Sequence, residues 1–359
     1  MNPVKILIIL TIFMTGLGTA GKVERVVVAT DRKGFTLHPS DNRFIPWGHN
    51  YASVDLLARL KNDPDRVVRE FKEMKATGTT VARLHPEMPR LLVGPGTVNP
   101  EGIALLRKVL KIAEEAGIHL MITGLACYQI DHRLDWYDTM DEEDRWETQA
   151  FFWETIALTC ADHPVVFAYD LVNEAAASGK PDHGWYTGRM GEVEFCQRLT
   201  LTPGSRKGDE IMHTWTKRMI ATIRQHDRET LVTMGMLPFP GAYRAAAAEL
   251  DFVSPHLYPE KGEVDEELAF LQRFDWNKPI VIGETFPLKC GADEERDFLL
   301  RSRRLAHGWL GHWPDQSPAK LAERKRKGEA TIHDAIWLSW VELFLEIGPQ
   351  MTEKPAVKR

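Results

Sequence analysis

Short, continuously apolar runs alternate along the chain with amphipathic segments. The amphipathic segments carry apolar residues at helical spacing. Asp63 and Pro64, for example, form a typical helix start, and Gly78 ends the same segment. The apolar runs show no strict alternation, which is typical of parallel strands buried on both faces. The runs occupy residues 44–50, 79–84, 118–123, 165–172, 230–236, 251–256, 279–284 and 307–313.

This repeat of eight strand–helix units predicts an α/β fold, a (β/α)8 TIM barrel forming a single domain with extended βα loops over residues 21–359. The alternative is an open doubly wound sheet, which usually has a glycine-rich phosphate loop after its first strand. The residues at that place, Pro46-Trp47-Gly48-His49, do not form such a loop.

Three other segments complete the predicted architecture. Residues 23–29 and 34–37 predict a hairpin that closes the floor of the barrel. Residues 175–208 are expected to be a long loop after the fourth strand, on the face where barrel active sites lie. Residues 317–345 are expected to form one long final helix.

The first twenty residues have the pattern of a secretory signal peptide. Lys5 precedes an apolar stretch at 6–17, and residues 18–20 form a small-residue cleavage site. An uncleaved anchor is the alternative, but the stretch is shorter than the ~20 residues needed to span a bilayer. We therefore expect a secreted or periplasmic protein that does not contact the membrane after cleavage.

The overall composition narrows the function further. Hydrophobic residues make up 43% and charged residues 27%, as in an ordinary soluble globular protein, and the net charge of −6 gives no basic excess for nucleic-acid binding. Nothing in the sequence indicates an oligomeric state. The cysteines could form disulfides after export or remain buried thiols, and their spacing fits no metal motif. They are Cys127, Cys160, Cys196 and Cys290.

Two glutamates end apolar runs that lie on opposite sides of the predicted barrel. Glu174 follows Asn173 at the end of the fourth run, and Glu284 ends the seventh. Polar residues at the carboxyl ends of barrel strands face one shared mouth. Cleavage of a glycosidic bond requires two carboxyl groups there, one to donate a proton and one ionised. The alternative is that one glutamate is a structural ion-pair partner, for instance of Arg83. Other polar or aromatic residues near the ends of runs are Arg83, His85, His256, Tyr258 and Trp313.

Together with the opening segment 44–51, these residues resemble clan A glycoside hydrolases, closest to the cellulase and β-mannanase group of family 5. The resemblance covers nearly the whole chain after the leader. It implies a retaining double displacement without a cofactor or metal ion, with Glu174 as acid/base and Glu284 as nucleophile. It also implies that Asn173 bonds the sugar 2-hydroxyl, that Arg83 and Tyr258 hold the nucleophile, that His256 lines the same subsite and that Trp313 stacks under the sugar.

The sequence departs from the family pattern in two places. The third run ends Thr123-Gly124-Leu125, where such enzymes often have a histidine, with His132 further along as a less favoured substitute. Ala175 follows Glu174, where proline is common. These differences leave the subfamily, the sugar, the linkage and endo or exo action open.

The expected function is an exported retaining β-glycosidase that acts on a polysaccharide or oligosaccharide. The alternative is a non-catalytic carbohydrate-binding barrel derived from such an enzyme. A metal-dependent barrel hydrolase is disfavoured because the chain has no H-x-H pair after the first strand and no H-E-x-x-H motif.

Overall fold

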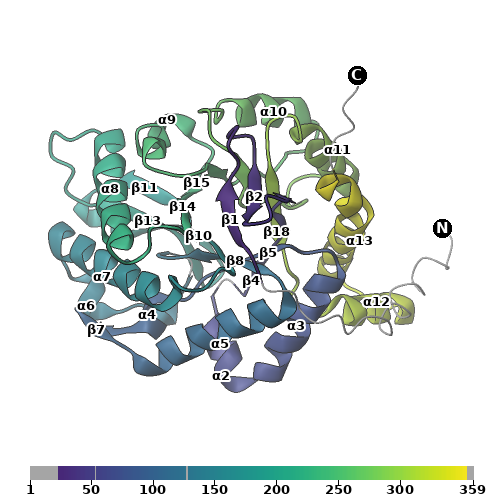
Figure 1. The fold of residues 1–359 in the computed structure, drawn as a ribbon, viewed down its shortest axis with the longest axis horizontal. Coiled ribbons are helices and arrows are strands. Elements are labelled where there is room, and N and C mark those ends of the chain that lie inside the picture. Colours follow the sequence, from purple (N-terminus) through teal and green to yellow (C-terminus); the bar gives the residue numbers. More distant parts are fainter. Residues whose placement is uncertain (1–22, 53, 127, 354–359) are drawn as a thin grey trace.

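The computed structural model describes residues 23–52, 54–126 and 128–353. The predicted leader and Cys127 lie outside these ranges. Parallel strands form the centre of the molecule and helices surround them (Figure 1). The main sheet has the strand order β14-β10-β8-β5-β4-β18-β17. Its strands are β4 (Trp47–Tyr51), β5 (Val81–Leu84), β8 (His119–Thr123), β10 (Val166–Asp170), β14 (Leu231–Thr233), β17 (Val281–Ile282) and β18 (Gly308–His312).

A short eighth strand closes this sheet into a barrel. β15 (Gly235–Met236) continues the line of β14 and pairs in parallel with β16 (Ser254–Pro255). On the other side of β16, Val253 forms a parallel bridge with Ile280, directly before β17. The seven strands of the main sheet and β16 together make the eight parallel strands of a (β/α)8 barrel, so the predicted fold class is confirmed.

The helices that cover the barrel begin and end where local chemistry favours it. The Asp63 side chain accepts a hydrogen bond from the Arg66 N–H and so caps α3. Gly117 ends α5 in the left-handed conformation. The helices are α2 (Leu56–Asn62), α3 (Pro64–Ala76), α4 (Met88–Leu91), α5 (Pro100–Ala116), α6 (Asp135–Asp138), α7 (Glu142–Cys160), α8 (Gly208–His226), α9 (Pro240–Tyr243), α10 (Val264–Gln272), α11 (Ala292–Ser302), α12 (Pro318–Lys327) and α13 (Ile332–Thr352).

The prediction of one long final helix is wrong, because the chain breaks between α12 and α13. Gly328 adopts a left-handed conformation with φ of 72°, which ends α12. Thr331 then starts α13, and its side chain accepts a hydrogen bond from the N–H of Asp334.

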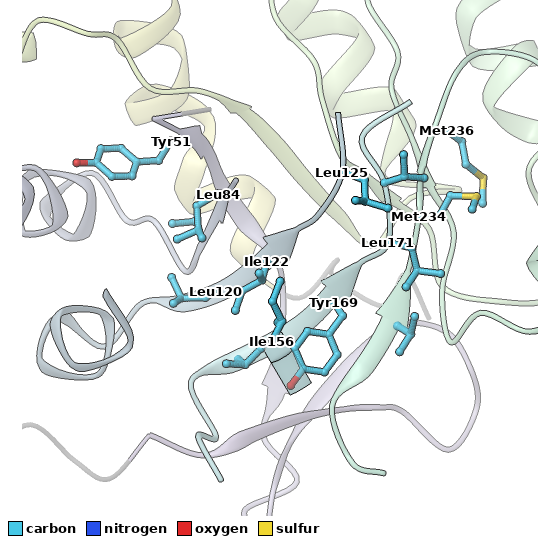
Figure 2. Packing of buried hydrophobic residues seen from close by; sticks show 14 of the residues in the cluster. Tyr51, Leu84, Leu120, Ile122, Leu125, Ile156, Tyr169, Leu171, Met234 and Met236 are labelled. Carbon is cyan, nitrogen blue, oxygen red and sulfur yellow. The ribbon is translucent and has the colours of Figure 1, made fainter. Parts of the chain in front are cut away.

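The main hydrophobic core lies between the barrel strands and the helices. Figure 2 shows Ile122 of β8 and Tyr169 of β10 beside Ile156 of α7. The three side chains are fully buried, and they join two neighbouring strands to the helix that follows β8. This packing holds the strand ends, and therefore the mouth of the barrel, in a fixed arrangement.

The predicted floor hairpin is present. β1 (Arg25–Val28) pairs antiparallel with β2 (Phe35–His38), and β2 pairs with β3 (Arg43–Phe44). The Phe35 ring meets Phe167 and Phe252 edge-on, with centroid distances of 5.2 and 5.4 Å. Phe167 of β10 and Phe252, which lies just before β16, stack on each other at 5.2 Å, so the hairpin covers the lower end of the barrel with aromatic rings.

The segment predicted as a long loop is instead largely a small β-sheet. Within residues 175–208, β11 (Ala175–Ser178) pairs in parallel with β13 (Val193–Thr200), which also pairs antiparallel with β12 (Tyr186–Met190). β9 (Tyr128–Gln129), from the loop after β8, adds to the other edge of β13. We call these strands the β9–β13 sheet.

A buried arginine anchors the β9–β13 sheet to the barrel. The guanidinium carbon of Arg145 lies 3.6 Å from the ring centre of Tyr137 and 4.3 Å from that of Trp185. The indoles of Trp185 and Trp47 are both buried, and Trp47 stacks on Phe344 at 4.2 Å. These two indoles therefore belong to the packing of the molecule.

Within the described ranges, no helix has the length and apolar character needed to cross a bilayer. Cys160, Cys196 and Cys290 are free thiols.

Candidate active site

Arg83 is the centre of the cluster at the barrel mouth. Its side chain is fully buried and donates to acceptors that come from several different strands. The distances are 2.6 Å to Asn50 Oδ1, 2.8 Å to Asp170 Oδ2, 2.9 Å to Asn173 Oδ1 and 2.7 Å to Glu284 Oε1. One planar cation thus fixes the relative positions of these strand ends.

Two residues of this cluster, Asp170 and Asn50, were missed in the sequence. Asp170 also accepts hydrogen bonds from Thr123 Oγ1 at 2.9 Å and from the Gly235 N–H at 2.6 Å. Asn50 Nδ2 donates to the carbonyl oxygens of Gly283 and Gly311, each at 2.9 Å. Both are polar residues at inward positions of otherwise apolar runs, and that position is the signal by which they could have been found.

Both carboxyl oxygens of Glu284 accept hydrogen bonds, which stabilise its ionised form. Arg83 donates to Oε1, and the Tyr258 hydroxyl donates to Oε2 at 2.6 Å. Burial alone would raise the pKa of Glu284, but the charges of His256 and Arg83 and the Tyr258 hydrogen bond bring this pKa well below its usual range. Glu284 is therefore ionised, as a nucleophile must be.

Glu174 has the opposite surroundings. Burial raises the pKa of Glu174, and the nearby Glu284 carboxylate adds to the rise, against the hydrogen bond with His256. His256 Nδ1 lies 2.8 Å from Glu174 Oε1 and 3.5 Å from Glu284 Oε1. His256 therefore links the two carboxyl groups, and Glu174 is the one that retains a proton more readily.

The carboxyl groups of Glu174 and Glu284 face the same small space. One ligand atom each from Glu174, His256 and Glu284 lie within 4.8 Å of one another. This limit is between individual ligand atoms, and it fits the ~5–5.5 Å separation of the carboxyl groups in retaining glycosidases better than the ~6.5–9.5 Å of inverting ones. The three residues are also, among the described residues, a group that could hold a metal ion. Arg83 already binds the Glu284 carboxylate there, and the absence of a metal from the mechanism stays a prediction.

The remaining predicted residues lie around this pair. His85 is buried with Nε2 3.4 Å from Arg83 Nη1. The backbone N–H of Trp313 donates to the Asn50 carbonyl oxygen at 2.9 Å, and the Trp313 ring lies beside His49. Trp313 Nε1 and His85 Nδ1 are buried without a hydrogen-bond partner among the described residues. The predicted site residues are thus brought together, while their individual roles stay predictions.

Two further histidines differ in their relation to the site. His132, the possible substitute for a third-strand histidine, bonds instead with Glu87 at 3.3 Å and with Arg90 at 3.2 Å. His312, which sequence reasoning missed, ends β18 with Nε2 2.9 Å from the Tyr258 hydroxyl. Its position directly before Trp313 was the available signal.

An eight-stranded barrel whose mouth presents two facing carboxyl groups with opposite pKa shifts defines the class of glycoside hydrolases. A family model described as cellulase (glycosyl hydrolase family 5) matches residues 61–280. The chain belongs to this family.

Solved structures with the same fold include several enzymes named for mannosides. The exo-β-1,4-mannosidase Op5Man5 from Opitutaceae bacterium strain TAV5 has a TM-score of 0.67 at 16% identity, and the match covers 91% of this chain and 62% of that one. The β-mannanase from the blue mussel Mytilus edulis has a TM-score of 0.58 at 15% identity, covering 91% and 97%. A family 5 subfamily 18 protein from Bifidobacterium longum has a TM-score of 0.59 at 14% identity, covering 87% and 81%. A comparison with curated proteins gives no significant sequence match.

Proposed function

We propose that the protein is an exported, retaining β-glycosidase that cleaves β-mannosidic bonds. The observation that carries the proposal is the pair Glu174 and Glu284, facing each other within 4.8 Å with pKa values shifted in opposite directions. The leader pattern at residues 1–20 supports export. A non-catalytic carbohydrate-binding barrel has no need of two carboxyl groups in opposite protonation states.

In the first half of the reaction, Glu284 attacks the anomeric carbon while Glu174 donates its proton to the leaving oxygen. The bond from the sugar to the leaving group breaks and an ester to Glu284 forms. In the second half, Glu174 takes a proton from water, the water oxygen attacks the anomeric carbon, and Glu284 leaves as a carboxylate. Two displacements restore the original anomeric configuration.

The support for a mannoside substrate comes from the neighbours in fold. They include proteins named as exo-β-1,4-mannosidase, β-mannanase and endo-1,4-β-mannanase. A variant of the Bifidobacterium longum protein was solved in complex with Manβ1-4GlcNAc. A sugar with a neutral ring fits a site whose central arginine, Arg83, is already bound to Asp170 and Glu284.

The test compares the wild type with Glu284→Gln and Glu174→Gln on aryl β-mannosides, aryl β-glucosides, β-mannans and β-glucans. Glu284→Gln should reduce turnover by at least ~10³-fold on every cleaved substrate, because no nucleophile remains. Glu174→Gln should cost ~10²–10⁴-fold on 4-nitrophenyl glycosides. It should cost much less in the first step with 2,4-dinitrophenyl glycosides, whose leaving group needs no proton.

The matched control is Glu249→Gln, which removes a partly exposed carboxylate on the outside of the barrel. NMR of the first anomer released should show retention, and a chelator should leave the rate unchanged. A wild type that binds mannosides but releases no product from any substrate would favour the binding barrel. Normal activity of Glu284→Gln would refute the assignment of the nucleophile.

A further inference from the structure

His312 lies against the nucleophile and faces the barrel mouth. Its Nε2 is 2.9 Å from the Tyr258 hydroxyl oxygen and 3.9 Å from Glu284 Oε2. The imidazole stacks on the Tyr258 ring, with an interplanar angle of 21°, and Phe286 meets it edge-on. Its side chain is 26% exposed, against 13% for Glu284 and 8% for Glu174. His312 is therefore more accessible to a ligand than the two carboxyl groups.

The hydrogen bonds around Tyr258 determine which ring nitrogen of His312 carries the proton. A tyrosine hydroxyl has one proton, and the 2.6 Å contact with the Glu284 carboxylate uses it. The hydroxyl oxygen can then only accept a hydrogen bond from His312. A neutral His312 with its proton on Nε2 satisfies this arrangement, and the second nitrogen, Nδ1, is then an acceptor.

This acceptor is open. Nδ1 of His312 has no hydrogen-bond partner among the described residues, and it is not sealed from solvent as His85 Nδ1 is. Burial lowers the pKa of His312. The Glu284 carboxylate opposes this effect and the charge of Arg83 adds to it, so the net shift favours the neutral ring, in which Nδ1 keeps its lone pair.

We propose that His312 is a substrate-binding residue whose Nδ1 accepts a hydrogen bond from one hydroxyl of the sugar in the reacting position. The proposal rests on the proposed glycosidase function. It adds a specificity determinant that is set by Tyr258, because the same tyrosine that orients the nucleophile also keeps His312 in the accepting form. The ligand recognised is a neutral pyranose with a free hydroxyl beside the nucleophile.

The experiment is a double-mutant cycle between His312 and the sugar. The rate constant kcat/KM is measured for wild type and His312→Phe on 4-nitrophenyl β-mannoside and on its 2-, 3-, 4- and 6-deoxy analogues. On the full sugar, His312→Phe should cost roughly tenfold, about the value of one hydrogen bond. On the analogue that lacks the partner hydroxyl, the same substitution should cost almost nothing. The deoxy position of that analogue identifies the hydroxyl that His312 binds.

Two conservative variants separate binding from a merely structural role. In His312→Asn the side chain ends near the former Nδ1 position, whereas in His312→Gln it ends near the former Nε2 position. His312→Asn should retain part of the coupling to that hydroxyl, and His312→Gln should lose it. His213→Phe, on the outer face of α8, is the matched histidine control and should match the wild type on all substrates.

Equal losses on all five substrates for His312→Phe, with the variant folded by circular dichroism, would overturn the proposal. The same conclusion follows if His312→Gln retains the coupling and His312→Asn does not. A wild type inactive on every glycoside would instead refute the proposed function, so the two failures are distinguishable.

Discussion

Glu174 and Glu284 are identical side chains that the surrounding residues place in different protonation states. Glu284 has a cation and a phenol hydroxyl bound to its two oxygens, whereas Glu174 has a buried position and one imidazole. Activity needs Glu284 ionised and Glu174 protonated, so it should fall at low pH as Glu284 gains a proton and at high pH as Glu174 loses one. The lowered pKa of Glu284 and the raised pKa of Glu174 widen the range between these limits.

Replacing Tyr258 with phenylalanine tests this arrangement. The Tyr258 hydrogen bond lowers the pKa of Glu284, so Tyr258→Phe should raise it and move the acidic limb of the kcat/KM profile to higher pH. We expect a loss of ~10-fold or more in kcat/KM below neutral pH, and a smaller loss above it. The measurement is the pH–rate profile with an aryl glycoside.

Tyr51→Phe is the matched control for this prediction. Tyr51 also donates to a buried carboxylate, Glu70, at 2.5 Å, but on the outer side of the barrel. Its loss should reduce stability without moving the acidic limb. An unshifted limb in Tyr258→Phe would mean that Tyr258 does not set the ionisation of Glu284.

Several site residues could be read from the sequence because each ends an apolar run, among them Glu174, Glu284 and Tyr258. Asn50 also ends a run and was overlooked, whereas Asp170 lies inside a run and could not be found by that rule; both act through Arg83. A sequence pattern shows where a strand ends. It does not show which inward side chain will meet the same guanidinium across the barrel.

At the scale of elements, close packing between neighbouring strands explains a glycine in β4. A Cβ atom on Gly48 would lie 1.7 Å from the carbonyl oxygen of Val81 in β5. Since this oxygen belongs to the backbone, the two strands would have to separate. The glycine therefore permits the register in which β4 and β5 pair at the site.

Gly48→Ala should therefore destabilise the protein by about 3 kcal/mol or more, at the upper end of overpacking effects. The measurement is urea unfolding followed by circular dichroism. Gly241→Ala, in α9, is the matched control, because no atom lies within 4 Å of its added Cβ. It should be neutral or stabilising by up to ~1 kcal/mol. Similar losses in both variants would contradict the packing argument.

Two elements were predicted wrongly for physical reasons. The break between α12 and α13 depends on Gly328 and Thr331, but the apolar spacing on both sides is helical and conceals the break. Three strands of the β9–β13 sheet lie within residues 175–200, with β12 and β13 as a hairpin, and β9 is added from the loop after β8. The apolar spacing of these short strands gives little local periodicity from which to predict them.

At the scale of the whole molecule, the fold was predictable because eight buried runs repeat with helices between them. The floor hairpin was also predictable, but its contribution to the free energy of unfolding was not. Phe35 is buried against Phe167 of β10 and Phe252 beside β16, so it connects the hairpin to segments that lie far apart in sequence. Stability of the barrel should therefore depend strongly on this one side chain.

Phe35→Ala should lower the free energy of unfolding by about 3–5 kcal/mol, the usual cost of removing a buried phenylalanine. Phe239→Ala is the control, because Phe239 is 62% exposed, and it should change the free energy by less than about 0.5 kcal/mol. Chemical denaturation of both variants gives the comparison. A small effect of Phe35→Ala would mean that the hairpin contributes little to the stability of the barrel.

The arc of the barrel from β15 to β17 has the shortest strands, each of two residues. His256, Tyr258 and Glu284 all follow directly from this arc. On heating, a thinly bonded arc opens before the rest of a fold does. The half-life of activity at elevated temperature is then set by the β15–β17 arc, and turnover should cease while most of the helices are still intact.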